Sequence, residues 1–386
     1  MFYCSVAQSV QGLQVSGQLS LEYRHFLNAP TDSRQLDHGQ FSTAGELEFT
    51  WEDEQGEYQL GFVPFFRADG RDRERSHVDL REAYWRWFSG DLEVTAGLDR
   101  VFWGVTESRH LVNIVNQVDA VENVDEEDYL GQPMLALAWQ KDWGRTEVFL
   151  LPYFRERTFP GVEGRLRTPL IVDTDGAQFE STDEESHLDI ALRYSHYFGS
   201  WDLGLSWFSG TSREPLLLAD AMGLSLVPFY SQINQLGIDL QYTGEAWLWK
   251  LEAIRREGQG KTFNALVGGF EYSFYQIFES DADLGLLGEY QYDGRDENAP
   301  ATIAQNDIFL GTRLAMNDVQ DTALLAGVIL DLDDQTTAIR LEAERRLGQS
   351  WRVELELQIV TNADPDNIAS GLANDDFITL SLKKYW

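Results

Sequence analysis

The chain has 386 residues, and its 64 Asp and Glu against 30 Lys and Arg give a formal net charge of -34 at pH 7. A phosphate polymer would be repelled by such a chain, which excludes nucleic-acid binding as a main role. Aromatic residues make up 13% of the sequence and prolines number only 10, a composition that favours strands over helices. No uncharged apolar run reaches the roughly 18 residues that a spanning helix needs, so a helical membrane protein is excluded as well.

The first seven residues, 1–7, resemble the end of a secretory signal peptide. Ser5 and Ala7 precede Gln8 in the pattern of small residues that marks a cleavage site. The basic region and most of the apolar run of a signal are missing. We therefore expect 1–7 to be the remnant of a signal peptide and 8–386 to form one mature domain, with a flexible cytosolic N-terminus as the alternative.

From residue 13 onward, apolar and polar residues alternate with a period of two, which is typical of strands with one apolar and one polar face. Each segment is close to the roughly 9 to 11 residues with which a tilted strand crosses a bilayer, and their even number suits a closed single-chain barrel. The sequence therefore predicts one all-β domain, a transmembrane antiparallel up-and-down β-barrel of about 18 strands. The expected strands are 13–25, 41–51, 58–68, 77–88, 92–102, 133–140, 145–154, 186–198, 201–209, 230–242, 247–257, 262–275, 282–292, 305–316, 322–331, 336–347, 351–360 and 376–386.

The connections between the expected strands alternate between short and mostly longer ones. Outer-membrane barrels have short periplasmic turns and longer external loops, so this alternation places both chain ends on the periplasmic side. Two connections on the expected external side, 258–261 and 332–335, are also short, which weakens the contrast between the lengths of periplasmic turns and external loops. The expected long external loops include 103–132, 155–185 and 210–229.

The last segment, 377–386, alternates and then ends on Trp386. It looks like the terminal strand of Gram-negative outer-membrane proteins, whose assembly machinery recognises a final strand that closes on Phe or Trp. This resemblance implies a porin-like barrel in the bacterial outer membrane, with the barrel assembly machinery as a partner through Trp386. The alternation assigns Leu380 and Leu382 to the lipid side and Ser381 and Lys383 to the interior.

The same alternation directs many charged residues into the barrel, because Arg and Lys facing lipid near mid-bilayer would cost roughly 2 to 4 kcal/mol each. Inward acids outnumber inward bases, which favours cations or neutral polar solutes over anions. The alternative is that these residues only brace the wall as cross-strand pairs. The candidate lumen charges are Arg81, Arg86, Arg193, Arg313, Arg340, Glu342, Glu344, Glu354 and Glu356.

The connection after the fifth expected strand opens with Asp99-Arg100-Val101-Phe102-Trp103-Gly104 and continues through Asn113, Asn116 and Asp119. It is similar to poorly characterised outer-membrane barrels, a few of them linked to export of lipid-like molecules, in which a Trp-Gly pair ends a strand and a loop with closely spaced Asn and Asp follows. Such long loops often fold into the barrel and narrow it. The candidates for a pore constriction are Arg100, Trp103, Asn116 and Asp119. The alternative is an external loop that shields the barrel mouth.

Motifs for catalysis and for metal binding are not found. The six histidines lack paired zinc spacing and no Gly-x-Ser-x-Gly elbow occurs. We expect no enzyme, no metal and no cofactor. The remaining enzymatic alternative is a barrel lipase that pairs Ser195 or Ser186 with His196 or His187.

The function that the sequence favours is a porin-like channel for passive diffusion of small hydrophilic solutes or ions, with a mild preference for cations. One alternative is a barrel that transports hydrophobic or lipid-like molecules in an export system, and a second is a non-conducting adhesion or structural barrel. The expected partners are outer-membrane lipid, lipopolysaccharide, the assembly machinery and small solutes. The sequence leaves open whether the barrels form homotrimers.

Overall fold

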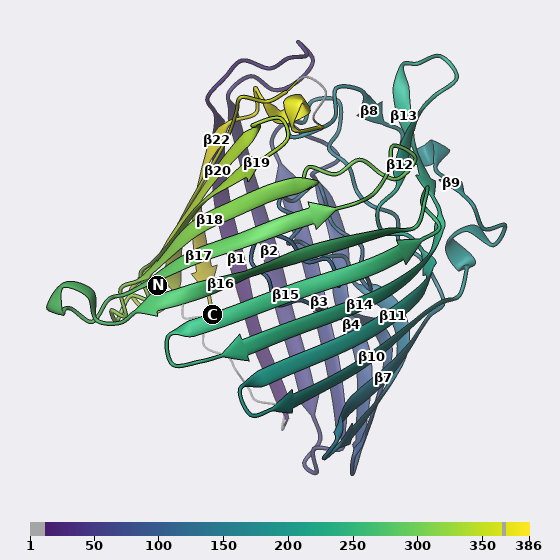
Figure 1. Ribbon diagram of the computed structural model, residues 1–386, viewed down its shortest axis with the longest axis vertical. Helices are drawn as coiled ribbons and strands as arrows, with labels where there is room; N and C mark the ends of the chain where they lie inside the picture. Colours follow the sequence, from purple (N-terminus) through teal and green to yellow (C-terminus); the bar gives the residue numbers. More distant parts are fainter. Residues whose placement is uncertain (1–11, 365–367) are drawn as a thin grey trace, which may run out of the picture.

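The computed structural model describes residues 12–364 and 368–386, and the expected signal remnant, 1–7, lies outside this part of the chain. Eighteen antiparallel strands form one continuous sheet that curves into a barrel (Figure 1). The wall strands are β1 (Leu13–Phe26), β2 (Gly39–Glu52), β3 (Tyr58–Asp69), β4 (His77–Ser89), β5 (Leu92–Asp99), β6 (Gln132–Lys141), β7 (Gly144–Leu151), β10 (Asp189–Phe198), β11 (Trp201–Thr211), β14 (Gln232–Thr243), β15 (Trp247–Glu257), β16 (Phe263–Phe274), β17 (Asp283–Asp293), β18 (Asn306–Ala315), β19 (Ala323–Asp331), β20 (Thr337–Leu347), β21 (Trp351–Thr361) and β22 (Phe377–Tyr385).

The wall closes where β22 pairs with β1 in register from Gln18 opposite Tyr385 to Phe26 opposite Phe377. Every other wall strand pairs with the wall strand before it and the wall strand after it. Closure removes the free sheet edges that would otherwise leave backbone groups unpaired in lipid. The predicted up-and-down barrel of 18 strands is confirmed.

Two strands end three residues earlier than the alternation predicts. β5 stops at Asp99 instead of residue 102, because the Asn116 amide takes over its ladder: Asn116 Nδ2 donates to the Asp99 carbonyl and its Oδ1 accepts the Val101 N–H. β7 stops at Leu151 instead of residue 154, since Pro152 follows and has no N–H to donate.

The outer face of the wall is apolar, with leucines such as Leu19, Leu205, Leu251 and Leu380 between 37% and 52% exposed. Trp and Tyr rings gather at the strand ends near the short turns, where Trp247 packs on Trp249 and Tyr272. This band with its aromatic belt is the surface that a bilayer covers in outer-membrane barrels. Among the described residues, no helix is both long and apolar enough to cross a membrane.

The expected loops 155–185 and 210–229 carry a small second sheet outside the wall. The hairpin of β12 (Leu216–Ala219) and β13 (Ser225–Tyr230) is joined by β8 (Ile171–Val172) and β9 (Gln178–Phe179), both parallel to β13. Figure 1 shows these strands together at the end of the barrel where the long loops lie.

Candidate functional site

The connection between β5 and β6, residues 100–131, runs inside the barrel; we call it the inner segment. Asn116 joins the two ends of the segment, because its Nδ2 also donates to the Leu130 carbonyl at 2.8 Å. The two arms are further joined by backbone hydrogen bonds, from Leu130 to Gln117 and from Asp119 to Asp128. The segment therefore leaves and re-enters the wall at one point and forms a closed lobe.

One side of the lobe is apolar. Trp103, Val112 and Val115 are at most 3% exposed. They pack in one cluster with inward-facing residues of the wall such as Phe149 and Phe208. The wall strands that contribute to this cluster are β6, β7, β10, β11, β14, β15 and β16. Burial of apolar area against these strands fixes this side of the segment to one half of the wall.

Two wall carboxylates accept backbone hydrogen bonds from the segment. The Glu252 carboxylate on β15 accepts from the N–H groups of Val105, Thr106 and Val112 at 2.7 to 3.1 Å. The Glu289 carboxylate on β17 accepts from those of Glu107 and Ser108, both at 2.8 Å. Buried N–H groups of irregular backbone have no partners in a helix or sheet. The two carboxylates accept hydrogen bonds from these groups and so remove the free-energy cost of leaving them unpaired.

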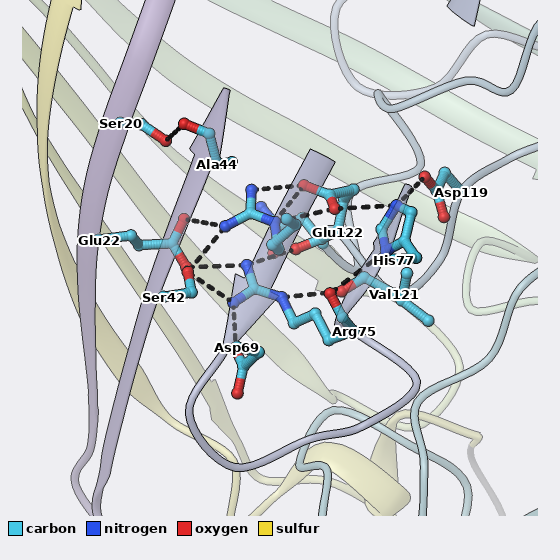
Figure 2. Close-up of polar contacts among 12 residues, drawn as sticks. Ser20, Glu22, Ser42, Ala44, Asp69, Arg75, His77, Asp119, Val121 and Glu122 are labelled. Carbon is cyan, nitrogen blue, oxygen red and sulfur yellow. Dashed lines mark hydrogen bonds and ion pairs between the residues drawn. The ribbon is translucent and has the colours of Figure 1, made fainter. Parts of the chain in front are cut away.

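The arm of the segment formed by residues 119–122 binds to β3 and β4 through ion pairs. Asp119 accepts from Arg81 of β4 at 2.6 Å, and Glu122 pairs with Arg67 of β3. Arg75, which follows β3, donates to the Val121 carbonyl at 3.0 Å (Figure 2). All these side chains are less than 10% exposed.

The pKa shifts of Asp119 and Arg75 both favour the charged forms of these two groups. Burial alone would raise the pKa of Asp119, but His77 and Arg81 outweigh it and hold that pKa well below its usual range. Burial alone would lower the pKa of Arg75, yet Glu22 and Glu122 raise it above the ordinary value. Asp119 and Arg75 therefore keep their charges across the physiological pH range.

His77, Asp119 and Glu122 bring three metal-ligating atoms within 4.8 Å of one another. His77 Nε2 lies 3.5 Å from Asp119 and 3.6 Å from Glu122 (Figure 2). Both carboxylates already pair with arginines, Arg81 and Arg67, whose positive charge would oppose a divalent cation at hydrogen-bond distance. A protonated imidazole between the carboxylates fits this surrounding better than a metal ion does.

A further part of the inner segment, residues 123–125, reaches β20 and β21. Asp125 accepts from Arg340 of β20 at 2.5 Å. Asn123 donates to Glu356 of β21 at 3.0 Å and accepts from Arg24 of β1 at 3.4 Å. Together with the contacts above, the inner segment is bonded to strands on opposite sides of the barrel, so it crosses the interior.

The four constriction candidates lie in or at the foot of this segment. Trp103 and Asn116 are each 3% exposed and Asp119 is fully buried; their contacts fix the segment to itself and to the wall. Arg100 pairs with Glu82 of β4 at 2.8 Å, beside the wall. Their effect on the width of a passage stays a prediction.

The predicted lumen charges differ in accessibility. Arg81, Arg86 and Arg193 have side chains only 4% to 23% exposed, and each is ion-paired with an Asp. Arg313, Arg340, Glu342 and Glu344 are 36% to 44% exposed. Glu354 pairs with Lys383 and Glu356 lies near Arg340. The accessible charges thus lie on β18 and β20 to β22, opposite the apolar attachment of the inner segment.

Sequence reasoning missed the segment's own polar anchors, Glu107, Glu122, Asn123 and Asp125. Glu107 accepts from Arg313 of β18 at 2.7 Å. Nothing local marks these residues, since they lie in irregular backbone and their partners are up to 233 positions away. The Ser195–His196 pair of the lipase alternative does not form, because successive residues of β10 point to opposite faces.

No protein-family model matches the chain, and no curated protein matches it in sequence. Among solved structures it is similar to Wzi of Escherichia coli, an outer-membrane protein involved in group 1 capsule assembly and described as a carbohydrate-binding β-barrel, at 10% identity and a TM-score of 0.57 over 95% of this chain and 83% of that one. It is also similar to OccD3 (OpdP) of Pseudomonas aeruginosa, at 10% identity and a TM-score of 0.56 over 98% and 91%.

At these identities the likeness concerns the fold. The closed wall, its apolar outer band and the charged interior define a β-barrel of the Gram-negative outer-membrane type. OccD3 shares this barrel architecture over nearly the whole chain.

Proposed function

We propose that this barrel is a channel through which small hydrophilic solutes or ions diffuse passively across the outer membrane, at a rate set by the inner segment. The observation that carries the proposal is the position of the more exposed of the predicted lumen charges. The inner segment packs its apolar side on β6 to β16. The more exposed of the predicted lumen charges lie on β18 and β20 to β22, where the segment attaches through polar contacts such as Glu107 with Arg313 and Asp125 with Arg340. Accessible charge inside a closed wall is what a water-filled passage requires.

A mild preference for cations is part of the proposal. Among the predicted lumen charges on β18, β20 and β21, four are acids, namely Glu342, Glu344, Glu354 and Glu356, and two are bases, Arg313 and Arg340. Net negative charge along a narrow path raises the local concentration of cations and lowers that of anions.

The test is planar-bilayer recording with purified full-length barrel. With a potassium chloride gradient across the membrane, we expect steady single-channel currents and a reversal potential displaced toward that of potassium. A membrane that stays silent with correctly folded barrel contradicts the channel, and a reversal potential on the chloride side contradicts the cation preference. Folding is checked independently by the shift in gel mobility between unheated and heated samples.

The transport of hydrophobic or lipid-like molecules is the second candidate. It is favoured by one observation, the strand β19, whose residues before Asp331 are apolar on both faces. The proposed partners are lipopolysaccharide and the barrel assembly machinery, and the proposed oligomeric state is a homotrimer. Chemical crosslinking in outer-membrane vesicles tests the oligomeric state.

A further inference from the structure

The interior face of β19 departs from the pattern of the wall. Leu310 and Ile339, both exposed on the outer face, flank Val328 in the sheet, so the even-numbered residues of β19 face outward and the odd-numbered ones face inward. The inward residues before Asp331 are therefore Ala323, Leu325, Gly327 and Ile329. A wall that borders water normally carries polar residues at such positions.

Many apolar inward residues elsewhere are covered. Those gathered in the cluster on β6 to β16, such as Phe149, Phe208 and Val267, are buried under the apolar side of the inner segment. Leu325 and Ile329 are only partly buried and belong to neither apolar cluster of the described chain. Their apolar surface thus faces the interior without a comparable cover.

The inner segment attaches on both sides of β19. On one side Glu107 accepts from Arg313 of β18 at 2.7 Å. On the other side Asp125 accepts from Arg340 of β20 at 2.5 Å. In the sheet, Arg313 is the direct neighbour of Leu325, and Arg340 is the direct neighbour of Gly327. The two ion pairs therefore border a strip of wall whose floor is β19.

The floor of this strip is closely packed at its glycines. A Cβ placed on Gly327 would lie 2.3 Å from a ring carbon of Phe309, and one on Gly311 would lie 2.7 Å from the ring. The Phe309 ring consequently rests on the two glycines, which are direct neighbours across β18 and β19. Only a residue without a side chain allows this contact. The Phe309 ring is itself buried, at 8% exposure, so the accessible apolar surface of the strip is that of the partly buried Leu325 and Ile329.

The charge around the strip is negative. Three bases (Arg313, Arg340 and Lys250) face five acids (Glu107, Glu271, Asp125, Glu342 and Glu356) in the ion pairs that border it. Glu342 is the direct neighbour of Leu325 and is 44% exposed, so its carboxylate lies beside the floor and remains accessible. An apolar floor next to an excess of acid complements a molecule that carries both an apolar group and a positive charge.

We propose that solutes pass the inner segment along β19, and that this strip prefers organic cations with an apolar group, which lies on Leu325 and Ile329 while the charge is held by Glu342. The proposal rests on the proposed channel function and names its solute class. It goes beyond a preference for cations in general, because the apolar group is recognised as well.

The experiment measures block of the sodium current through single barrels by three probes. Benzyltrimethylammonium carries a ring and a positive charge, tetramethylammonium carries the charge alone, and benzenesulfonate carries a ring and a negative charge. We expect benzyltrimethylammonium to block at a concentration about tenfold lower than tetramethylammonium, as partial burial of a ring predicts, and benzenesulfonate to be the weakest blocker.

Variants separate the two contributions. Leu325→Asn should bring the two cations to within about twofold of each other, whereas Leu325→Met, which keeps the apolar surface, should retain the difference. Glu342→Gln should weaken the block by both cations to a similar degree. If Leu325→Asn fails to reach the membrane, Ile329→Thr supplies the same comparison.

The outcomes distinguish this inference from the function on which it rests. No current through the folded wild-type barrel overturns the channel itself. Normal currents with equal block by the two cations, or an unchanged preference in both Leu325→Asn and Ile329→Thr, overturn only the role of β19.

Discussion

Glu252 on β15 accepts hydrogen bonds from both the backbone N–H and the hydroxyl of Thr106, at 3.1 and 2.7 Å, although the two residues are 146 positions apart. The Glu252 side chain is completely buried. This one carboxylate therefore ties the inner segment to the wall by several hydrogen bonds, and it also accepts from Val105 and Val112.

Replacing Glu252 by Ala should release residues 105–112 of the inner segment from the wall. Each buried N–H left without a partner costs about 1 to 3 kcal/mol, which is enough to detach a loop but not to open the barrel. We expect faster cleavage by chymotrypsin near Phe102 and Trp103 and larger, noisier single-channel currents. Glu354→Ala is the control, because Glu354 pairs with Lys383 of the wall at 2.8 Å. Equal currents in the two variants would contradict this role of Glu252.

Adjacent residues of β1 test which face of the wall meets lipid. Leu19 is 41% exposed on the outer face, and Gln18 is its inward neighbour. Leu19→Arg should lower the free energy of unfolding in lipid vesicles by about 2 to 4 kcal/mol, since a charge near mid-bilayer is poorly solvated. Gln18→Arg should change that free energy by less than about 1 kcal/mol. Denaturant unfolding followed by Trp fluorescence measures both, and a reversed order would mean that the faces are wrongly assigned.

His110 in the inner segment makes the attachment sensitive to alkaline pH. Its Nε2 lies 3.3 Å from Glu127 and its Nδ1 lies 3.8 Å from Glu252. Burial alone would lower the pKa of His110, but the two glutamates outweigh it and raise that pKa to about 9. The stabilisation by the charged imidazole is thus complete below the unfolded pKa of about 6.5 and is lost as the pH rises through about 9.

Current noise of the wild-type barrel should therefore increase between neutral pH and about pH 10, as His110 loses its charge. In His110→Gln the noise at neutral pH should already be raised and should vary less with pH, because no charge is lost at that position. A variant with the same alkaline increase as the wild type would assign the effect to another group.

The C-terminal Trp386 offers a test of the assembly partner. Its backbone exchanges hydrogen bonds with Gly17 of β1, at 3.2 and 3.3 Å, while its side chain is 56% exposed. Trp386→Ala should therefore leave the stability of the folded barrel nearly unchanged and should lower severalfold the amount assembled in cells. Trp351→Ala is the matched control, since Trp351 is also exposed on the outer face in the neighbouring strand β21. Equal yields of the two variants would remove Trp386 as a recognition signal.

The wall could be predicted because successive side chains of each strand point alternately to lipid and to the barrel interior. Residues 13–24 and 351–359 carry that alternation without a break, and a register error of one residue would exchange the faces. The alternation was least informative at β19, where both faces are apolar, and at the ends of β5 and β7, where Asn116 and Pro152 decide where the strand ends.

The interior could be predicted only in part. The sequence directed Arg313, Arg340 and Glu356 inward, but their partners Glu107, Asp125 and Asn123 lie in irregular backbone without periodicity. Which side chains of a loop meet which strands depends on how the loop crosses the closed barrel. That path depends on many weak long-range contacts, and no single local pattern encodes it.

The docking sites of the inner segment on β15, β17 and β18 are formed by residues that follow it by more than a hundred positions. While the chain is incomplete, Trp103, Val112 and Val115 have no surface to cover them. We therefore expect the lobe to settle late in biogenesis, after the hairpins that receive it have joined. Until then these apolar residues are exposed in the periplasm and prone to aggregation. We expect a periplasmic chaperone to bind this stretch of the unassembled chain.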